Sequence, residues 1–481
     1  LTNVNKSQYN GIYYKQKRKE GAMMLVGFSV SNYKSFKDGQ TISFEASKIV
    51  RHKSHVAVKK NKRILKSGLI FGANAGGKSN LVKAIQFSRK IVVSGLDKVD
   101  LTKNHFRVES EMYNQPGVFE YRIMIGEVEY SYGIAISYDR KIILAEWLVR
   151  IENQGKEVYL FNREMDENYV SHAQSEAEYA GMEEKYRMDI YLESFSENAS
   201  QAYKRKTILN DIALRTNEGT GIFAEIRMVY AWFEDMIILF PESKYNGLNE
   251  VAAEIDKKQF FSKALSYFDT GIEGVEGERQ QIDFDKILDN IPADQAERIK
   301  IDISNEVNEH PVMLKVNDQV YELRKDENGN IVYNKLLLNH GNAKDMFVYN
   351  DESDGTKRLF DLIPLFYENR KVSMILIDEI DRSLHTNLIR KFMELFYQIA
   401  ENRDCQLIAT THDSNLLDLE LLRQDEIWFV ERQKDHSSKV FSLNRFKERF
   451  DKKIDKEYLL GRYGAIPVFD ESFTLEEVYE E

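Results

Sequence analysis

A glycine-rich loop, Gly-x-x-x-x-Gly-Lys-Ser at residues 72–79, constrains this chain more than any other feature. It fits the phosphate-loop pattern. The apolar residues 69–71 before it predict a short buried strand, and residues 81–87 after it predict a helix. Glycines let backbone N–H groups turn toward a phosphate, and the N-terminus of the following helix adds positive charge. The sequence therefore predicts a phosphate site on a strand–loop–helix unit, in which Lys78 reaches the β- and γ-phosphates and Ser79 ligates Mg²⁺.

Composition limits the other classes of function. The length of 481 residues allows two to three domains, and a hydrophobic content of 42% is enough for a large core. The single cysteine, Cys405, excludes disulfide and metal-finger scaffolds and favours a reducing, cytoplasmic location. No apolar run approaches the roughly 18 residues that span a bilayer, so no membrane contact is expected. With a net charge of −11, any nucleic-acid contact has to be local.

The pattern of the chain divides it into four parts. Residues 1–23 are polar and basic without periodicity, and we expect a disordered or non-native leader, with translation starting at Met23 or Met24. Residues 24–165 are rich in strand signals, residues 166–308 are mainly helical, and residues 309–481 return to strands and an α/β pattern. The simplest interpretation is an α/β ATPase head, split in sequence by an inserted helical region and carrying an antiparallel β subdomain.

Individual elements follow from periodicity and turn signals. Strands are expected at 25–30, 41–44, 119–126, 127–138, 142–151, 312–316, 320–323 and 331–338. Helices are expected at 201–214, 222–240 and 251–268.

The second half of the site is expected at three segments nearer the C-terminus. The apolar strand at 372–377 ends in Asp378 and Glu379, and we expect it beside the strand that feeds the loop. Asp378 would hold Mg²⁺ through its waters, and Glu379 would orient and polarise the attacking water. Ser353 precedes a helix expected at 359–368 as a suitable N-cap, and Gly355 permits close approach of a ligand. A further apolar strand, 406–410, is followed by Thr-His-Asp.

The order of these motifs matches ABC-type ATPase heads, and the chain resembles their SMC/RecF-like branch. Within that branch it is similar to the AAA/ABC ATPases of bacterial anti-phage defence and abortive infection, of the RloA and AbiL type. The resemblance covers about residues 24–468. The matching segments are 28–36, 72–81, 352–359, 377–381, 411–414 and 458–467.

The resemblance implies a role for each matching residue. Glu379 would be the catalytic base, His412 the switch histidine near the γ-phosphate, and Asp378 a support for Mg²⁺ together with Ser79. Ser353 and Gly355 would form a signature that contacts ATP bound to a second protomer, and Asp381 would link the two sites. The residues implied in ATP binding are Gly72, Asn74, Gly76, Gly77, Lys78, Ser79, Asn80, Ser353, Gly355 and Asp381. The signature departs from Leu-Ser-Gly-Gly-Gln, because Asp354 and Thr356 replace a Gly and the Gln, and this predicts slow hydrolysis.

A signature that acts on a second protomer implies a homodimer, or a higher homo-oligomer, with ATP between the heads. Overcoming-lysogenisation-defect proteins resemble this head but add a nuclease domain with an Asp-x-Asp pair. Here that pair occurs only at 283–285, inside the insertion, so we expect a toxic effector or nuclease on a separate chain.

The leading hypothesis is thus an ATP-dependent sensor or regulator of anti-phage defence. A DNA-repair ATPase of the RecF/SMC type and a nucleotide-dependent scaffold are the alternatives. Eight lysines and arginines without an acid between residues 48 and 66, and the shorter basic run at 203–206, are the candidate nucleic-acid contacts.

Overall fold

The computed structural model describes residues 23–59, 62–197, 199–217, 219–289, 291–307, 312–316, 319–367 and 373–467. They form two compact units. The first unit contains residues up to 241 together with 371–381 and 392–481, and the second contains 242–370 and 382–391. The predicted leader, apart from Met23, lies outside the described residues, and the four-part division of the sequence remains a prediction.

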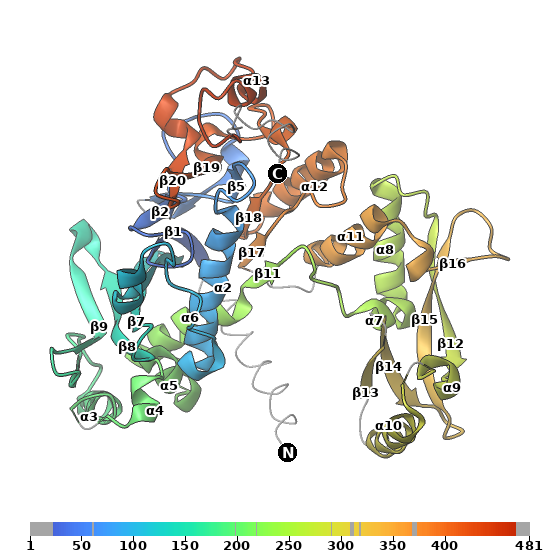
Figure 1. The fold of residues 1–481 in the computed structure, drawn as a ribbon, viewed down its shortest axis with the longest axis horizontal. Helices are drawn as coiled ribbons and strands as arrows, with labels where there is room; N and C mark the ends of the chain where they lie inside the picture. Colours follow the sequence, from blue (N-terminus) through green and yellow to red (C-terminus); the bar gives the residue numbers. More distant parts are fainter. Residues whose placement is uncertain are drawn as a thin grey trace, which may run out of the picture. The chain divides into compact units, whose positions relative to one another are not determined.

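The first unit is built on a six-stranded sheet with the order β11-β17-β18-β5-β19-β20 (Figure 1). Neighbouring strands are parallel from β11 to β19, and β20 is antiparallel to β19. Every residue of β5, β17 and β18 is buried, as expected for central strands of a parallel sheet. The strands are Ile237–Leu239 (β11), Met374–Ile377 (β17), Gln406–Thr410 (β18), Ser67–Phe71 (β5), Ile427–Arg432 (β19) and Ser438–Ser442 (β20).

The expectation that the Asp-Glu strand lies directly beside the loop strand is wrong. β18 lies between them, pairing with β17 on one edge and with β5 on the other. In this order the backbone of β18 forms hydrogen bonds with a strand on each side. The hydrophobic pattern of a sequence identifies buried strands but does not say which of them become neighbours. The three strands remain parallel, so their carboxyl ends still meet at one edge of the sheet.

A seven-stranded antiparallel sheet with the order β10-β9-β8-β7-β6-β1-β2 forms the second layer of this unit. The strands are Ser171–Gln174 (β10), Glu157–Met165 (β9), Ile142–Ile151 (β8), Val128–Ser137 (β7), Gly117–Ile125 (β6), Met23–Ser31 (β1) and Gln40–Ser43 (β2). The strands predicted between residues 25 and 151 are confirmed. One apolar core joins residues of this sheet with α2 (Lys78–Ser94) and α6 (Gly221–Asp235). A two-stranded ribbon of β3 (Val56–Lys59) and β4 (Lys62–Leu65) completes the strands of this unit that the structure describes.

Two helix predictions in the first unit are corrected. The helix expected at 222–240 ends at Asp235, and Ile237–Leu239 form β11 on the edge of the parallel sheet. The helix expected at 201–214 is broken into α4 (Gln201–Lys204) and α5 (Ile208–Arg215). Thr207 causes the break, because its extended backbone and side-chain oxygen, which accepts from the Asn210 N–H, start a new helix. The remaining helices described in this unit are α3 (Met182–Glu193) and α13 (Ile454–Leu459), and α12 (Thr386–Glu401) runs from the second unit into the first.

The second unit contains an antiparallel sheet in the order β12-β15-β14-β13, with β16 paired to β15. The strands predicted at 312–316, 320–323 and 331–338 are confirmed, whereas β12 lies in the part of the chain that was predicted to be mainly helical. The helix predicted at 251–268 is divided at Glu254 into α7 and α8. The strands are Gly274–Gln281 (β12), Ile331–Asn339 (β15), Gln319–Lys325 (β14), Val312–Val316 (β13) and Phe347–Val348 (β16); the helices are Leu248–Ala253 (α7), Ile255–Tyr267 (α8), Phe284–Ile287 (α9), Ala293–Glu306 (α10) and Asp354–Leu362 (α11).

The predicted fold class is confirmed. The chain is an α/β protein with a phosphate loop between a central parallel strand and a helix, as in ABC-type heads, and with an antiparallel β layer. Its inserted region contains the helices α3 to α10. The insertion also contains β11 and β12, which pair with strands far away in sequence.

Candidate nucleotide site

The glycine loop joins β5 directly to α2, as the motif predicts. Gly72 has a φ of 155° and Gly77 a φ of 114°, which side chains rarely adopt. A Cβ at Gly72 would also collide with the Val430 carbonyl oxygen of β19. The loop therefore lies close against the neighbouring strand, and only glycine fits at these two positions.

Lys78 begins α2 and is buried, with 4% of its surface exposed. Its ammonium group donates to the carbonyl oxygens of Gly72 (2.7 Å) and Ala73 (3.1 Å) and lies 3.2 Å from the His412 ring. Burial lowers the pKa of Lys78 to about 8, although the carboxylates of Asp381, Asp378 and Glu379 oppose the shift. An ammonium group forms stronger hydrogen bonds with a phosphate than with neutral carbonyl oxygens. An anionic ligand in the loop would therefore replace the carbonyls as the partner of Lys78.

The two carboxylates at the end of β17 are held by a residue of β18. The Thr410 hydroxyl donates to Asp378 Oδ1 at 2.6 Å and accepts from the Glu379 N–H at 2.8 Å. Glu379 has a φ of 50°, a conformation that costs free energy in a non-glycine residue and persists only where neighbours enforce it. Asp378 is buried, whereas Glu379 is partly exposed at the sheet edge.

His412 and Asp381 complete this edge. The His412 backbone N–H donates to Asp381 Oδ2 at 3.0 Å, and its Nε2 lies 3.8 Å from Glu379 Oε1. The other oxygen of Asp381 is buried and has no hydrogen-bond partner among the described residues. The structure thus brings Lys78, Asp378, Glu379, Asp381 and His412 together.

The remaining predicted loop residues differ in environment. Ser79 is half-buried at the start of α2, and Asn74 is exposed at the tip of the loop. The Asn80 amide, one residue after the loop, donates to the Ser35 hydroxyl at 2.8 Å.

These residues fit a nucleotide with Mg²⁺. The glycine cradle, the buried Lys78 and the unpartnered Asp381 oxygen are features that an anion and its counter-ion would satisfy. Among the described residues no cluster of three or more His, Cys, Asp or Glu could hold a metal alone. A Mg²⁺ ion would therefore contact the Ser79 hydroxyl, reach the Asp378 carboxylate through bound water, and complete its coordination shell with phosphate oxygens and further water.

Ser353 and Gly355 belong to the second unit, at the start of α11. The Ser353 hydroxyl accepts from the Thr356 N–H at 3.1 Å, which confirms the predicted N-cap. The helix predicted at 359–368 begins five residues earlier, at Asp354, because the cap starts it there, and it ends at Leu362 before Pro364. A Cβ at Gly355 would lie 2.8 Å from the Ser383 carbonyl oxygen, so this glycine is needed for close packing.

Three residues that sequence reasoning did not assign to the site support it. Thr410 fixes both carboxylates, as described above. Ser438 of β20 donates to the Gly76 carbonyl at 2.7 Å, and its N–H donates to the Ser35 carbonyl at 2.7 Å. Ser35 lies in the segment 28–36, which is one of the segments that carry the family resemblance. That resemblance could have indicated that Ser35 belongs to the site.

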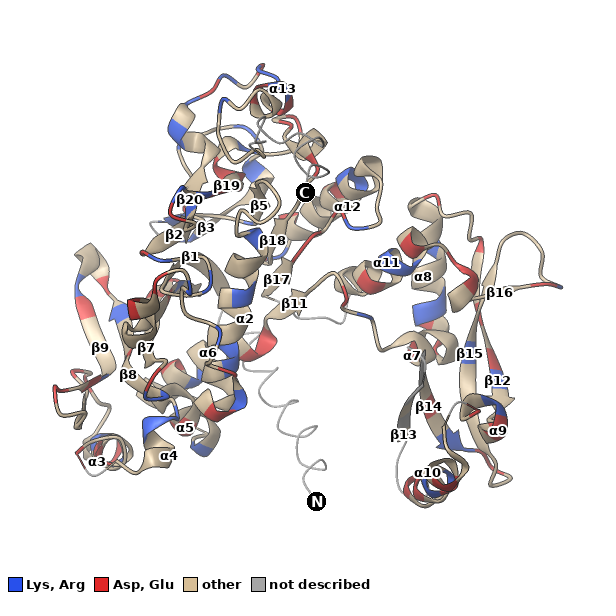
Figure 2. Ribbon diagram, in the orientation of Figure 1, with Lys and Arg blue, Asp and Glu red and all other residues tan. Residues whose placement is uncertain are grey.

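The basic run at 48–66 is largely occupied by interactions inside the first unit. Lys59 pairs with Asp404 at 2.5 Å and Lys62 with Glu129 at 2.6 Å, while the buried Lys66 donates to the Ala400 carbonyl. Arg51 contacts Glu420, and Arg63 donates to the Ser47 carbonyl. Basic and acidic residues are interspersed along both units (Figure 2). The run therefore has a structural explanation, which weakens its interpretation as a nucleic-acid contact.

The fold and the site define the class of protein: an α/β head in which a phosphate loop joins a central parallel strand to a helix, with an antiparallel β layer beside it. The chain belongs to the family described as "AAA domain, putative AbiEii toxin, Type IV TA system", whose model matches residues 69–197 and 252–418, more than half of the chain. The match includes the loop, the signature, the Asp-Glu strand and His412.

The chain is also similar to solved structures. One is described as the SMC head domain from Thermotoga maritima, with 14% identity and a TM-score of 0.35, covering 87% of this chain and 98% of that one. Another is an SMC head bound to the C-winged helix domain of ScpA, with 14% identity and a TM-score of 0.36, covering 88% and 100%. A comparison with curated proteins found no match. No helix in the described part of the chain has the length and apolar character needed to cross a bilayer.

Proposed function

We propose that the chain is an ABC-type ATPase that binds and slowly hydrolyses ATP. The observation that carries this proposal is the convergence of Lys78, Asp378, Glu379 and His412 at the carboxyl edge of three parallel strands. A cation for phosphate, a carboxylate for a metal and a second carboxylate for water are the components that phosphoryl transfer to water requires.

Each side chain would perform one task. Lys78 would leave the loop carbonyls and contact the β- and γ-phosphates, and Ser79 and Asp378 would hold Mg²⁺, which neutralises charge on the phosphate oxygens. The Glu379 carboxylate would orient a water and accept its proton. His412, 3.8 Å from Glu379, would contact the γ-phosphate side of the site and keep the carboxylate in place. Asp381 would couple the His412 backbone to the neighbouring protomer.

The biological role that we infer is that of a sensor or regulator in an abortive-infection, anti-phage system of the RloA or AbiL type. The family description, which names a toxin and a Type IV toxin–antitoxin system, and the motif resemblance both support it. In this proposal ATP joins two heads into a homodimer or a higher homo-oligomer, and Ser353 and Gly355 contact the nucleotide of the partner protomer. The assembly would restrain or release a toxic effector or nuclease on a separate chain.

The test of the chemistry is the replacement of Glu379. Glu379→Gln keeps the size of the side chain but removes the proton acceptor, so turnover of ATP should fall roughly a hundredfold or more. Binding of ATP should persist. Glu401→Gln, an exposed acid at the end of α12, is the matched control and should leave the rate unchanged. Hydrolysis by Glu379→Gln at the parental rate would remove Glu379 from the role of base.

A further inference from the structure

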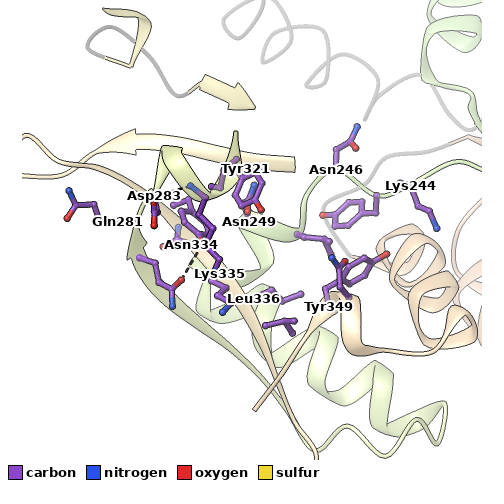
Figure 3. Close-up of a pocket in the computed structure, with 18 of the residues that line it drawn as sticks. Lys244, Asn246, Asn249, Gln281, Asp283, Tyr321, Asn334, Lys335, Leu336 and Tyr349 are labelled. Carbon is purple, nitrogen blue, oxygen red and sulfur yellow. Dashed lines mark hydrogen bonds between the residues drawn. The ribbon is translucent and has the colours of Figure 1, made fainter. Parts of the chain in front are cut away.

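The second unit contains a cavity of about 780 Å³. It is lined by the strands β12, β14 and β15, the start of α7 and the residues before it, the α9 region, and the segment from β16 to the first turn of α11. Its volume lies in the range of small-molecule sites. Figure 3 shows side chains converging on it from the sheet and from the segment that carries Tyr349.

Positive charge is in excess along the wall of this cavity. Four lysines line it, Lys244, Lys286, Lys335 and Lys357, against two aspartates, Asp283 and Asp289. Lys357 donates to the Asn350 carbonyl at 2.9 Å, and Lys244 lies 3.8 Å from Asp361. The ammonium groups of Lys286 and Lys335 have no hydrogen bond or ion pair with any described residue. Two free cations in one concave wall favour an anionic ligand.

The rest of the wall suits a planar, hydrogen-bonding group. Tyr321 and Tyr333 form an edge-to-face pair with ring centroids 5.1 Å apart, and the Tyr333 hydroxyl donates to Gln280 at 3.2 Å. The Gln280 amide, which lies on the same face of the sheet as Tyr333, supplies both a donor and an acceptor that can pair with the edge of a nucleobase. Tyrosine rings give bases a surface on which to stack.

We propose that this cavity binds a phosphorylated nucleoside, with Lys286 and Lys335 on the phosphate and the tyrosines and the Gln280 amide on the base. This site is separate from the glycine loop, whose residues all belong to the first unit. The ligand chemistry is that of a base joined to a phosphate monoester, which a free nucleotide and the end of a short single strand share.

The cavity wall is continuous with the signature segment. Tyr349 and Asn350 precede Ser353 by four and three residues, and Lys357 lies in the first turn of α11, which Ser353 caps. A ligand that draws Lys357 from the Asn350 carbonyl would alter this turn. Ligand binding would therefore modulate ATP hydrolysis, a consequence that rests on the proposed function.

The experiment uses the full chain with Lys78→Ala, so that the glycine loop does not contribute to binding. The probes for calorimetric titration are AMP and GMP, with adenosine, inorganic phosphate and a poly-glutamate peptide as comparison ligands. A 5′-phosphorylated dinucleotide distinguishes the end of a strand from a free nucleotide. Lys286→Ala combined with Lys335→Ala is the test variant. Lys263→Ala is the matched control, because Lys263 is an exposed lysine of α8 outside the cavity.

We expect AMP or GMP, or the dinucleotide, to bind saturably and more tightly than adenosine or phosphate. The double variant should weaken this binding at least tenfold, the scale of losing a charged hydrogen bond, whereas the control should stay within twofold. No nucleotide binding up to several millimolar, equal affinity in the double variant, or preferential binding of the acidic peptide would each overturn the proposal.

The coupling is tested on the chain with Lys78 intact. Saturating nucleotide should change its ATP hydrolysis rate by more than twofold, and this change should disappear in the double variant. An unchanged rate would overturn the coupling to α11. Because binding is measured without Lys78 and hydrolysis with it, failure of the cavity site and failure of the ATPase assignment give different results.

Discussion

At the scale of single residues, Lys78 shows how the nucleotide site is prepared. Its ammonium group is buried among loop carbonyls, and its pKa falls to about 8 because burial disfavours the charge. Three carboxylates nearby oppose that shift, but they do not contact the ammonium group in the described structure. A phosphate in the loop would supply the direct anionic partner that the carbonyls do not.

Cys405, directly before β18, offers a pH-dependent test of packing in the first unit. Burial raises the pKa of this thiol to about 11. The thiolate is the reactive form, so below that pKa its fraction grows about tenfold for each unit of pH. The rate of alkylation by iodoacetamide should therefore keep rising steeply from pH 8 to pH 10. Free N-acetylcysteine, the control, levels off near its own lower pKa, and a plateau of the protein at the same pH would contradict the burial.

At the scale of elements, a buried ion pair fastens α5 to the antiparallel sheet. Glu146 of β8 accepts from Arg163 of β9 at 3.1 Å, and both side chains are almost fully buried. The same carboxylate accepts from the N–H groups of Ile208 (2.7 Å) and Leu209 (3.0 Å) in the first turn of α5. A negative charge at a helix N-terminus also meets the favourable end of the helix dipole.

Removing one partner of this pair should be costly. Glu146→Gln leaves the buried Arg163 without its counter-charge, and we expect the free energy of unfolding to fall by about 3–5 kcal/mol. Urea unfolding monitored by circular dichroism measures the change. Glu127→Gln, an exposed acid at the β6–β7 turn, is the control and should have no effect. If Glu146→Gln unfolds at the same urea concentration as the parent chain, the ion pair does not hold α5 in place.

The elements also show what the sequence could predict. The phosphate loop was predictable because its glycines are required by backbone geometry that local sequence determines. β11 was not, since Ile237–Leu239 continue the apolar pattern of α6 and become a strand only by pairing with β17. The polar β12 is likewise fixed by β15. Thr410 could not be assigned to the site, because its role depends on β18 lying between β5 and β17.

At the scale of the whole molecule, the central question is how the signature in the second unit acts. In the proposed assembly Ser353 completes the site of a partner protomer, so Ser353→Arg should block ATP-dependent association sterically while binding of ATP persists. Hydrolysis should be lost. Sedimentation velocity in the Glu379→Gln background, with and without ATP, measures the association.

Mixing two inactive variants provides the control for this prediction. Ser353→Arg retains an intact phosphate loop, and Lys78→Ala retains an intact signature, so a heterodimer contains one complete composite site. Partial recovery of hydrolysis is expected. Association of Ser353→Arg with ATP as complete as that of the parent would contradict the head-to-head arrangement.

The most direct test of the account is calorimetric titration with a non-hydrolysable ATP analogue in the presence of Mg²⁺. The parent chain should bind it, and Lys78→Ala should lose tight binding, because the substitution deletes the cation that the loop buries for the β- and γ-phosphates. Lys83→Ala, an exposed lysine of the same helix, should bind as the parent does. Unchanged affinity in Lys78→Ala would contradict the assignment of residues 72–79 as the nucleotide site.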